Sequence, residues 1–142
     1  MFYSQLQEKI PGTDILWHSA LYLPRWDIYA IPTFSQEEEI IKTARCLSSF
    51  CKDKDIDIKN VIFHSFLRPQ VYNDIIGGSK MSGHITGHAV DFSVRGVPCD
   101  NIRAILVPEL EARGLRCEKK PGSNWVHVDT KEPGPSGRYF KP

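Results

Sequence analysis

A ten-residue stretch of the sequence brings two histidines and an aspartate close together. It runs from Ser82 to Asp91, reads Ser-Gly-His-Ile-Thr-Gly-His-Ala-Val-Asp, and contains His84 and His88. A third imidazole, His127, follows in the run Trp-Val-His-Val-Asp. Two histidines and one carboxylate, with a fourth position left to water, form the ligand set of a catalytic zinc site. Zinc activates water and polarises carbonyl groups, so these residues indicate metal-assisted hydrolysis.

The alternation of residue types around His127 is typical of a strand. In a strand, Trp125, His127 and Asp129 lie on one face, and Val126 and Val128 lie on the other. The same ligand set can also hold iron(II). The sequence contains no P-loop, G-x-G-x-x-G, G-x-S-x-G or H-E-x-x-H pattern, so it offers no motif for the corresponding nucleotide or hydrolase chemistries.

Length and charge narrow the class of protein. The chain has 142 residues and a formal net charge of +1, which predicts one domain over residues 1–142 with a core of its own. The near-zero charge predicts neither nucleic acid nor a membrane surface as a partner, and no pattern indicates an oligomeric state. The polar N-terminus predicts no signal peptide. Together with four scattered cysteines, it leads us to expect a protein made in the cytoplasm.

Hydrophobic patterns predict an α+β fold with a small antiparallel sheet flanked by helices. A capping box at Ser35 and Glu38, followed by apolar residues at helical spacing, predicts a helix over 36–52. Pro108 should divide a second helix over 100–113, which Gly114 closes. The N-terminal part, 1–34, is expected to form short extended pieces and turns. Further along the chain, the patterns predict strands at 60–66 and 89–94, a short helix at 69–76, a hairpin of 115–119 with 124–130 around 120–123, and a loop over 132–137.

Three segments together resemble the M15 family of zinc D-Ala-D-Ala peptidases. They are the run from Ser65 to Ser79, the run from Ser82 to Asp91, and Trp125-Val-His127. The family pattern is S-x-H-x-x-G-x-A-x-D with a later W-x-H, and every fixed position is filled. The resemblance covers about 60–95 and 115–130. It implies the α+β fold of hedgehog and D-Ala-D-Ala peptidases.

The resemblance also implies roles for particular residues. His84, Asp91 and His127 would be the zinc ligands. Arg68 would bind substrate or stabilise the developing oxyanion, although a surface ion pair is its alternative interpretation. Ser82 would lie beside the metal as a substrate-binding hydrogen-bonding group. His88, at a variable family position, is expected at the surface or behind the ligands.

The residue at the family position of the general base departs from the family pattern. Family members carry a carboxylate three residues before the last ligand, where this chain has Asn124, and an amide cannot accept the proton. With an even turn in the hairpin, Glu118 pairs with Trp125 and shares the face of His127; an odd turn would place Lys119 there. Asp129 is the second candidate, with an orienting role for a metal ligand as its alternative.

The resemblance implies a zinc peptidase that cuts a peptide bond in peptidoglycan stem peptides. D-Ala-D-Ala carboxypeptidase and L-Ala-D-Glu endopeptidase activities both remain open. A phage lysis enzyme, released to the cell wall, would explain how a protein without an export signal reaches this substrate, as would a bacterial enzyme exported by another route. The alternative is a zinc-holding peptidoglycan-binding or virion structural protein without catalysis, which Asn124 favours.

Overall fold

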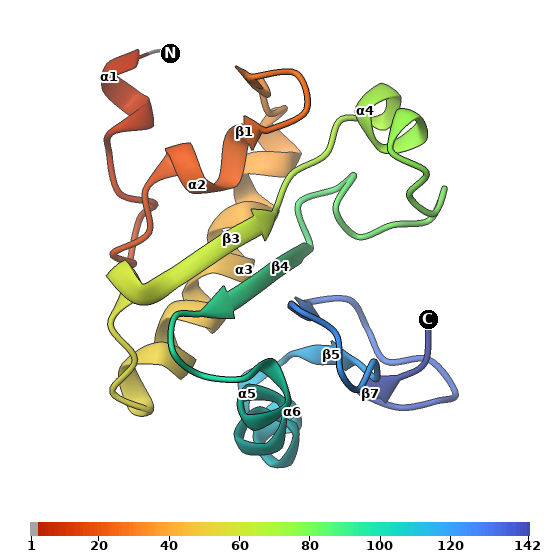
Figure 1. Ribbon diagram of the computed structural model, residues 1–142. Helices are drawn as coiled ribbons and strands as arrows, with labels where there is room; N and C mark the ends of the chain where they lie inside the picture. Colours follow the sequence, from red (N-terminus) through yellow and green to blue (C-terminus); the bar gives the residue numbers. More distant parts are fainter. Residues whose placement is uncertain (1–2) are drawn as a thin grey trace.

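The computed structural model describes residues 3–142 and has an α+β fold, as the sequence predicts (Figure 1). Its main sheet has the strand order β3-β4-β6-β5-β7, and all neighbours are antiparallel except β5 and β7, which are parallel. The strands are β3 (Val61–Ser65), β4 (Ala89–Val94), β5 (Arg116–Glu118), β6 (Val126–Asp129) and β7 (Tyr139–Phe140). A separate two-stranded sheet pairs β1 (Tyr22–Leu23) with β2 (Ile28–Tyr29).

The long helix α3 (Phe34–Asp53) passes behind β3 and β4 in the view of Figure 1. Its capping box is Thr33 with Gln36, so the predicted box at Ser35 and Glu38 is wrong by two residues. Thr33 has the extended backbone that an N-cap needs, and its Oγ1 accepts a hydrogen bond from the Gln36 N–H at 3.1 Å. One face of α3 is buried in the core that the sheet shares.

The second predicted helix is divided at Pro108, as expected. It consists of α5 (Cys99–Leu106), the 3-10 turn η2 (Val107–Glu109) and α6 (Leu110–Arg113), and Gly114 ends it in a left-handed conformation with φ 68°. The other helical elements are α1 (Tyr3–Leu6), α2 (Trp17–Leu21), η1 (Ile58–Asn60) and α4 (Gln70–Ile75). No helix among residues 3–142 combines the length and the apolar character needed to cross a membrane.

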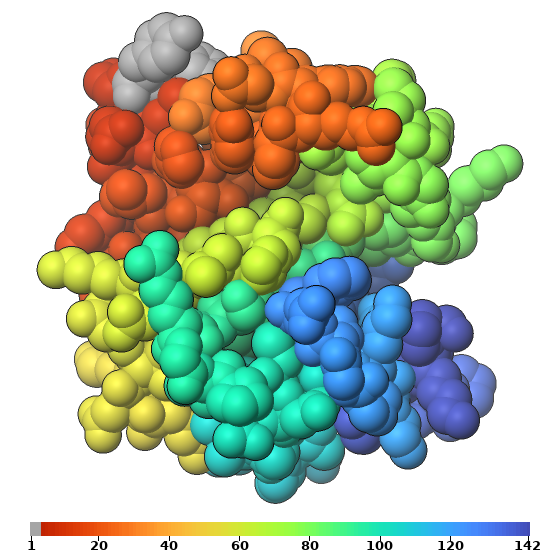
Figure 2. Space-filling view, in the orientation of Figure 1, coloured from red at the N-terminus to blue at the C-terminus, as the bar shows by residue number. Residues whose placement is uncertain are grey.

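One local prediction needs correction. The N-terminal 34 residues contain the short helices α1 and α2 beside the expected extended pieces, because helices of one turn leave no periodic pattern. Residues 132–137 form a loop with turns, as predicted. The strand β7 follows this loop, and no local signal predicts it, since its parallel partner β5 lies more than twenty residues earlier in the sequence. Figure 2 shows the N-terminal segment in red and orange and the C-terminal segment in blue, on opposite sides of the yellow-green strand β3.

The hairpin of β5 and β6 forms, but its register differs from the predicted one. Arg116 pairs with Asp129 and Cys117 with Val128. Extending this register places Glu118 opposite His127, two residues from the predicted partner Trp125. The connection 119–125 is longer than the predicted turn of 120–123. A shift of two residues preserves the face of each side chain, so Glu118 still shares the face of His127.

The two faces of the main sheet differ in chemistry. The face toward the core carries apolar side chains that are fully buried, namely Val90, Phe92, Cys117, Val126 and Val128. Alternation along the strands places Asp91, His127 and Glu118 on the opposite face, where they lie on three adjacent strands. The sheet therefore acts as the scaffold for a polar site.

The reactivity of the four cysteine thiols tests which of them are buried in the core. In the part of the chain that the structure describes, all four are free, and Cys51 and Cys117 are buried, which raises the pKa of each thiol to about 12. Because the thiolate is the reactive form, we expect Cys51 and Cys117 to react with a disulfide reagent at pH 8 only as fast as the fold opens. Half-buried Cys46 and Cys99 should react first. Four equally fast thiols in the folded protein would contradict this arrangement.

Candidate metal centre

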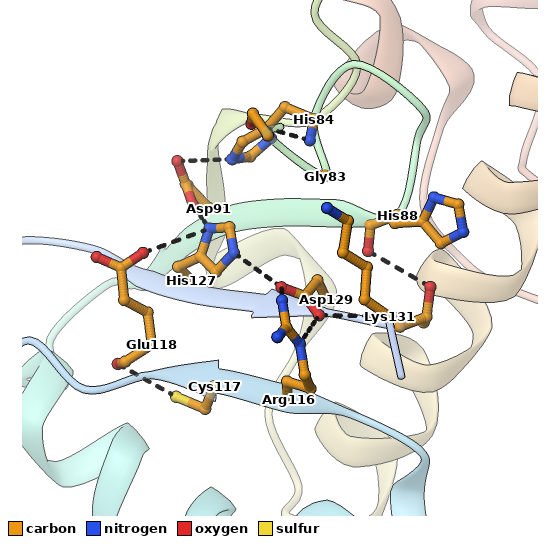
Figure 3. A network of polar contacts seen from close by, with 12 residues as sticks. Gly83, His84, His88, Asp91, Arg116, Cys117, Glu118, His127, Asp129 and Lys131 are labelled. Carbon is orange, nitrogen blue, oxygen red and sulfur yellow. Dashed lines mark hydrogen bonds and ion pairs between the residues drawn. The ribbon is translucent and has the colours of Figure 1, made fainter. Parts of the chain in front are cut away.

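Three side chains on the polar side of the sheet converge on one point. Asp91 on β4 lies directly opposite His127 on β6, and His84 approaches from the loop that precedes β4 (Figure 3). One ligand atom from each residue can be chosen so that all lie within 4.8 Å of one another. Asp91 Oδ2 is 3.1 Å from His84 Nε2, and Asp91 Oδ1 is 2.7 Å from His127 Nδ1. The structure thus brings together the three residues that the resemblance implies as ligands.

The surroundings of His84 fix which of its nitrogens carries the proton. Its Nδ1 lies 2.8 Å from the carbonyl oxygen of Phe66, which can only accept, so Nδ1 donates. Its Nε2 is buried and has no hydrogen-bond partner among the residues that the structure describes. This nitrogen faces the Asp91 carboxylate, and two lone pairs at 3.1 Å repel unless a cation lies between them. The donor set therefore fits a divalent metal.

Asp91 lies at the centre of the cluster. Burial raises the pKa of its carboxyl, but the contacts with His127 and His84 outweigh burial and hold that pKa well below its ordinary value. Arg68 contributes a further contact, with Nη2 3.4 Å from Asp91 Oδ2. Asp91 is consequently a carboxylate at neutral pH, which is the form that binds metals.

A second carboxylate lies behind His127. Asp129 Oδ2 is 3.2 Å from His127 Nε2, and Arg116 donates to both oxygens of Asp129, with Nε–Oδ1 at 2.7 Å and Nη2–Oδ2 at 2.9 Å. Burial lowers the pKa of His127, but the hydrogen bonds with Asp129 and Asp91 outweigh it and raise the pKa to about 9. Asp129 is thus tied to Arg116 and to the outer nitrogen of His127.

Glu118 lies on the other side of His127. Its Oε2 is 4.0 Å from His127 Nδ1, the nitrogen that faces Asp91 (Figure 3). Its side chain stays 17% exposed and has no other ion pair in the described chain, so it is freer to move than Asp129. Asn124, at the family position of the base, lies in the connection before β6 and lines a pocket with Ser93 and Pro98.

Arg68 is held in place by its neighbours at the end of β3. Its Nε donates to Ser65 Oγ at 2.7 Å and its Nη1 to Asn73 Oδ1 at 3.3 Å, beside the contact with Asp91. Its side chain is 15% exposed. Arg68 thus lies at the edge of the cluster, in an ion pair that is largely buried rather than at the surface.

The loop that carries His84 is held from two sides. The Arg68 N–H donates to the His84 carbonyl oxygen at 2.8 Å, and Ser82 Oγ accepts from the His84 N–H at 3.2 Å. On the other side, helix α3 contributes Gln36, whose Nε2 donates to the Ile85 carbonyl, and Thr43, whose Oγ1 donates to the Gly87 carbonyl. Helix α3 therefore positions a predicted metal ligand that belongs to another element.

Gly87 allows this loop to pass close to α3. It has φ +85°, and a Cβ there would lie 3.0 Å from both the Gln36 carbonyl oxygen and Ile40 Cγ1. We expect Gly87→Ala to lower the free energy of unfolding by about 1–3 kcal/mol and to displace His84. Gly96→Ala is the matched control, because Gly96 has φ +76° but open space around it. Equal losses in urea unfolding would show that the contact with α3 does not matter.

The other histidines lie outside the cluster. His88 contacts Glu39 and Thr86, with Nε2–Oε2 at 3.1 Å and Oγ1–Nδ1 at 2.6 Å. His64 contacts Ser93, and His18 packs against two tyrosine rings. The position of His88 agrees with the peripheral role that the sequence suggests for it.

Sequence reasoning missed the side chains that support the site. Arg116 lies two residues before Glu118 on β5, so strand alternation could have placed it on the polar face. Asn73 is fully buried, and its amide joins Arg68 to the Ser79 carbonyl. Phe140 had no signal, because it belongs to the unpredicted strand β7.

Comparison with known proteins agrees with this geometry. No curated protein matches the sequence significantly. The family model described as Peptidase M15 matches residues 30–129, which include every residue of the cluster as well as Arg68, Glu118 and Asp129. The match spans more than half of the chain and contains both elements that meet at Asp91 and His127. This chain belongs to the peptidase M15 family.

Proposed function

We propose that the protein is a zinc peptidase that hydrolyses a peptide bond in peptidoglycan stem peptides, of the D-Ala-D-Ala carboxypeptidase or the L-Ala-D-Glu endopeptidase type. The observation that carries the proposal is the cluster of His84, Asp91 and His127. Beside it lies the carboxylate of Glu118, which forms no ion pair with any other described residue than His127. The family supplies the reaction class, a peptidase.

In this proposal His84 Nε2, Asp91 and His127 Nδ1 hold the metal. When bound, zinc supplies a Lewis acid that polarises the scissile carbonyl and makes water a stronger nucleophile. His84 is fixed for this role by its hydrogen bond to Phe66, and His127 by Asp129. Both ligands are therefore oriented before the metal arrives, which reduces the cost of binding.

Glu118 accepts the proton of the attacking water and returns it to the leaving amine. What supports this assignment is its place beside the metal-facing nitrogen of His127 and its freedom from other ion pairs among the described residues. Asp129 instead accepts the Nε2–H of His127, since both of its oxygens are already bound by Arg116. The candidate bases thus take different roles.

Arg68 and Ser82 bind the substrate. The guanidinium of Arg68 is pinned by Ser65, Asn73 and Asp91 at the edge of the cluster, where a fixed positive charge can hold a substrate carboxylate or the developing oxyanion. Ser82 uses its oxygen to accept from His84, which leaves its hydroxyl proton free to donate to a peptide carbonyl.

We further propose that the protein is phage-encoded, made in the cytoplasm and released to the cell wall during lysis. Its proposed substrate lies outside the compartment in which the protein is made. A release step that coincides with lysis brings the two together.

The test is release of D-alanine or of stem-peptide fragments from purified peptidoglycan by the zinc-loaded protein. Zinc content is measured on the same sample, and His127→Ala is the control. We expect turnover with about one zinc per chain, lost in the control. Bound zinc without cleavage of either bond would contradict the proposal and favour the zinc-holding binding protein that Asn124 suggests.

A further inference from the structure

The C-terminal strand places an aromatic ring against the metal centre. The Phe140 ring lies under the Arg116 guanidinium, with 4.1 Å between Arg116 Cζ and the ring centroid. The same ring meets His127 edge-on, with centroids 6.2 Å apart at 82°. The backbone fixes this arrangement, because the Lys119 N–H donates to the Phe140 carbonyl oxygen at 2.6 Å, and Phe140 pairs with Glu118.

The guanidinium that rests on Phe140 is the one that holds Asp129. Arg116 donates two parallel hydrogen bonds to a carboxylate that is only 2% exposed. A guanidinium can rotate about its long side chain, and the ring beneath it restricts that rotation. Asp129, held in this way, accepts the Nε2–H of His127 at 3.2 Å.

We propose that Phe140 and Arg116 are positioning residues of the metal centre, which hold Asp129 so that His127 keeps its proton on Nε2 and presents Nδ1 to the metal. This inference rests on the proposed zinc site. While it is ionised, Asp129 can accept a hydrogen bond but cannot donate one, so its contact selects the tautomer of His127 that leaves the Nδ1 lone pair free. The chain of contacts runs from β7 through β5 to β6.

Part of this chain of contacts lies outside the residues that the family model matches. The family model ends at residue 129, whereas Phe140 lies in β7. Arg116 and Asp129 lie within the match and pair across β5 and β6. The inference therefore depends on a contact that the family match does not contain.

The experiment compares zinc affinity among four variants by chelator competition. Arg116→Met removes the charge but keeps the length, and we expect about a 10- to 100-fold weaker affinity. Phe140→Leu keeps an apolar side chain but removes the aromatic face, and we expect a loss of about 3- to 10-fold. Phe140→Tyr should restore wild-type affinity. Phe34→Leu is the matched control, because this phenylalanine is 76% exposed at the start of α3.

Two further readouts separate positioning from general stability. The visible spectrum of the cobalt-substituted protein and the nitrogen shifts of His127 in the zinc-bound protein should both change in Phe140→Leu but not in Phe140→Tyr. Wild-type affinity and an unchanged cobalt spectrum in Phe140→Leu would overturn the inference, as would an equal loss in Phe34→Leu. These readouts need no substrate, so zinc binding without peptidase activity would contradict the proposed function alone.

Discussion

Glu118→Gln is expected to lower kcat by about 100- to 10,000-fold while zinc stays bound. The amide keeps the size of the side chain but cannot accept a proton. Glu118 is not one of the three clustered ligand residues, and its carboxylate is 4.0 Å from His127, so the metal site should survive the change. The measurement is steady-state hydrolysis of a stem peptide at saturating zinc, with metal content determined on the same protein.

Two companion variants decide between the possible bases. Asp129→Asn should weaken zinc binding and leave most of kcat once zinc is saturating, because Asp129 acts through His127. Asn124→Ala should keep wild-type turnover, because it lies in the connection before β6. Near-normal turnover in Glu118→Gln would remove Glu118 as the base. A large loss of kcat in zinc-saturated Asp129→Asn would assign that role to Asp129.

Zinc is expected to raise the thermal midpoint by about 10 °C or more. At about 1,000 times its Kd, a ligand that binds only the folded state contributes about 4 kcal/mol, and for a chain of this size each kcal/mol shifts Tm by roughly 2–4 °C. The metal also removes the repulsion between the buried His84 nitrogen and the Asp91 carboxylate. Calorimetry with and without zinc measures the shift.

This zinc-dependent shift should grow with pH. In the metal-free protein the pKa of His127 is raised from 6.5 to about 9 by Asp129 and Asp91, which outweigh burial. Its protonated form therefore stabilises the metal-free fold fully below pH 6.5, and this stabilisation is lost as pH rises through about 9. Zinc replaces that proton, so the difference in Tm should be larger at pH 9 than at pH 6.5.

Asp91→Asn is the control for both measurements. It removes the charge at the centre of the cluster, and with it the zinc-dependent shift. A wild-type shift in this variant would place the metal elsewhere. A zinc effect that shrinks between pH 6.5 and pH 9 would contradict a protonated His127 in the metal-free protein.

The sequence predicts the elements that carry strong local signals. Strand β4 has the predicted bounds, α3 extends the predicted helix by two residues at its start and one at its end, and Pro108 divides the helix as expected. The clustering of His84, Asp91 and His127 follows from the family pattern together with strand alternation. For the helices and the strand, a hydrophobic period or a backbone constraint lies within the segment itself.

What the sequence does not predict depends on pairing between distant segments. The partner of Glu118 was misplaced because the length of a hairpin loop sets the register, and the connection 119–125 exceeds a tight turn. Phe140 was missed because its role arises only where β7 joins β5, and the contact of Arg116 with Asp129 depends on the register between β5 and β6. Tertiary contacts, rather than local propensities, assemble the support of the site.

The two ways in which β6 is joined to its neighbours bear on how this site can change over evolution. Asp91 and His127 meet across strands whose connection includes α5 and α6, so insertions or deletions in that connection can be absorbed without moving either residue. Glu118 reaches His127 through a hairpin. If one residue is inserted into 119–125 and the pairing of β5 with β6 shifts by one residue, Lys119 replaces Glu118 on the polar face. A single small insertion could thus abolish hydrolysis in a descendant that still binds zinc.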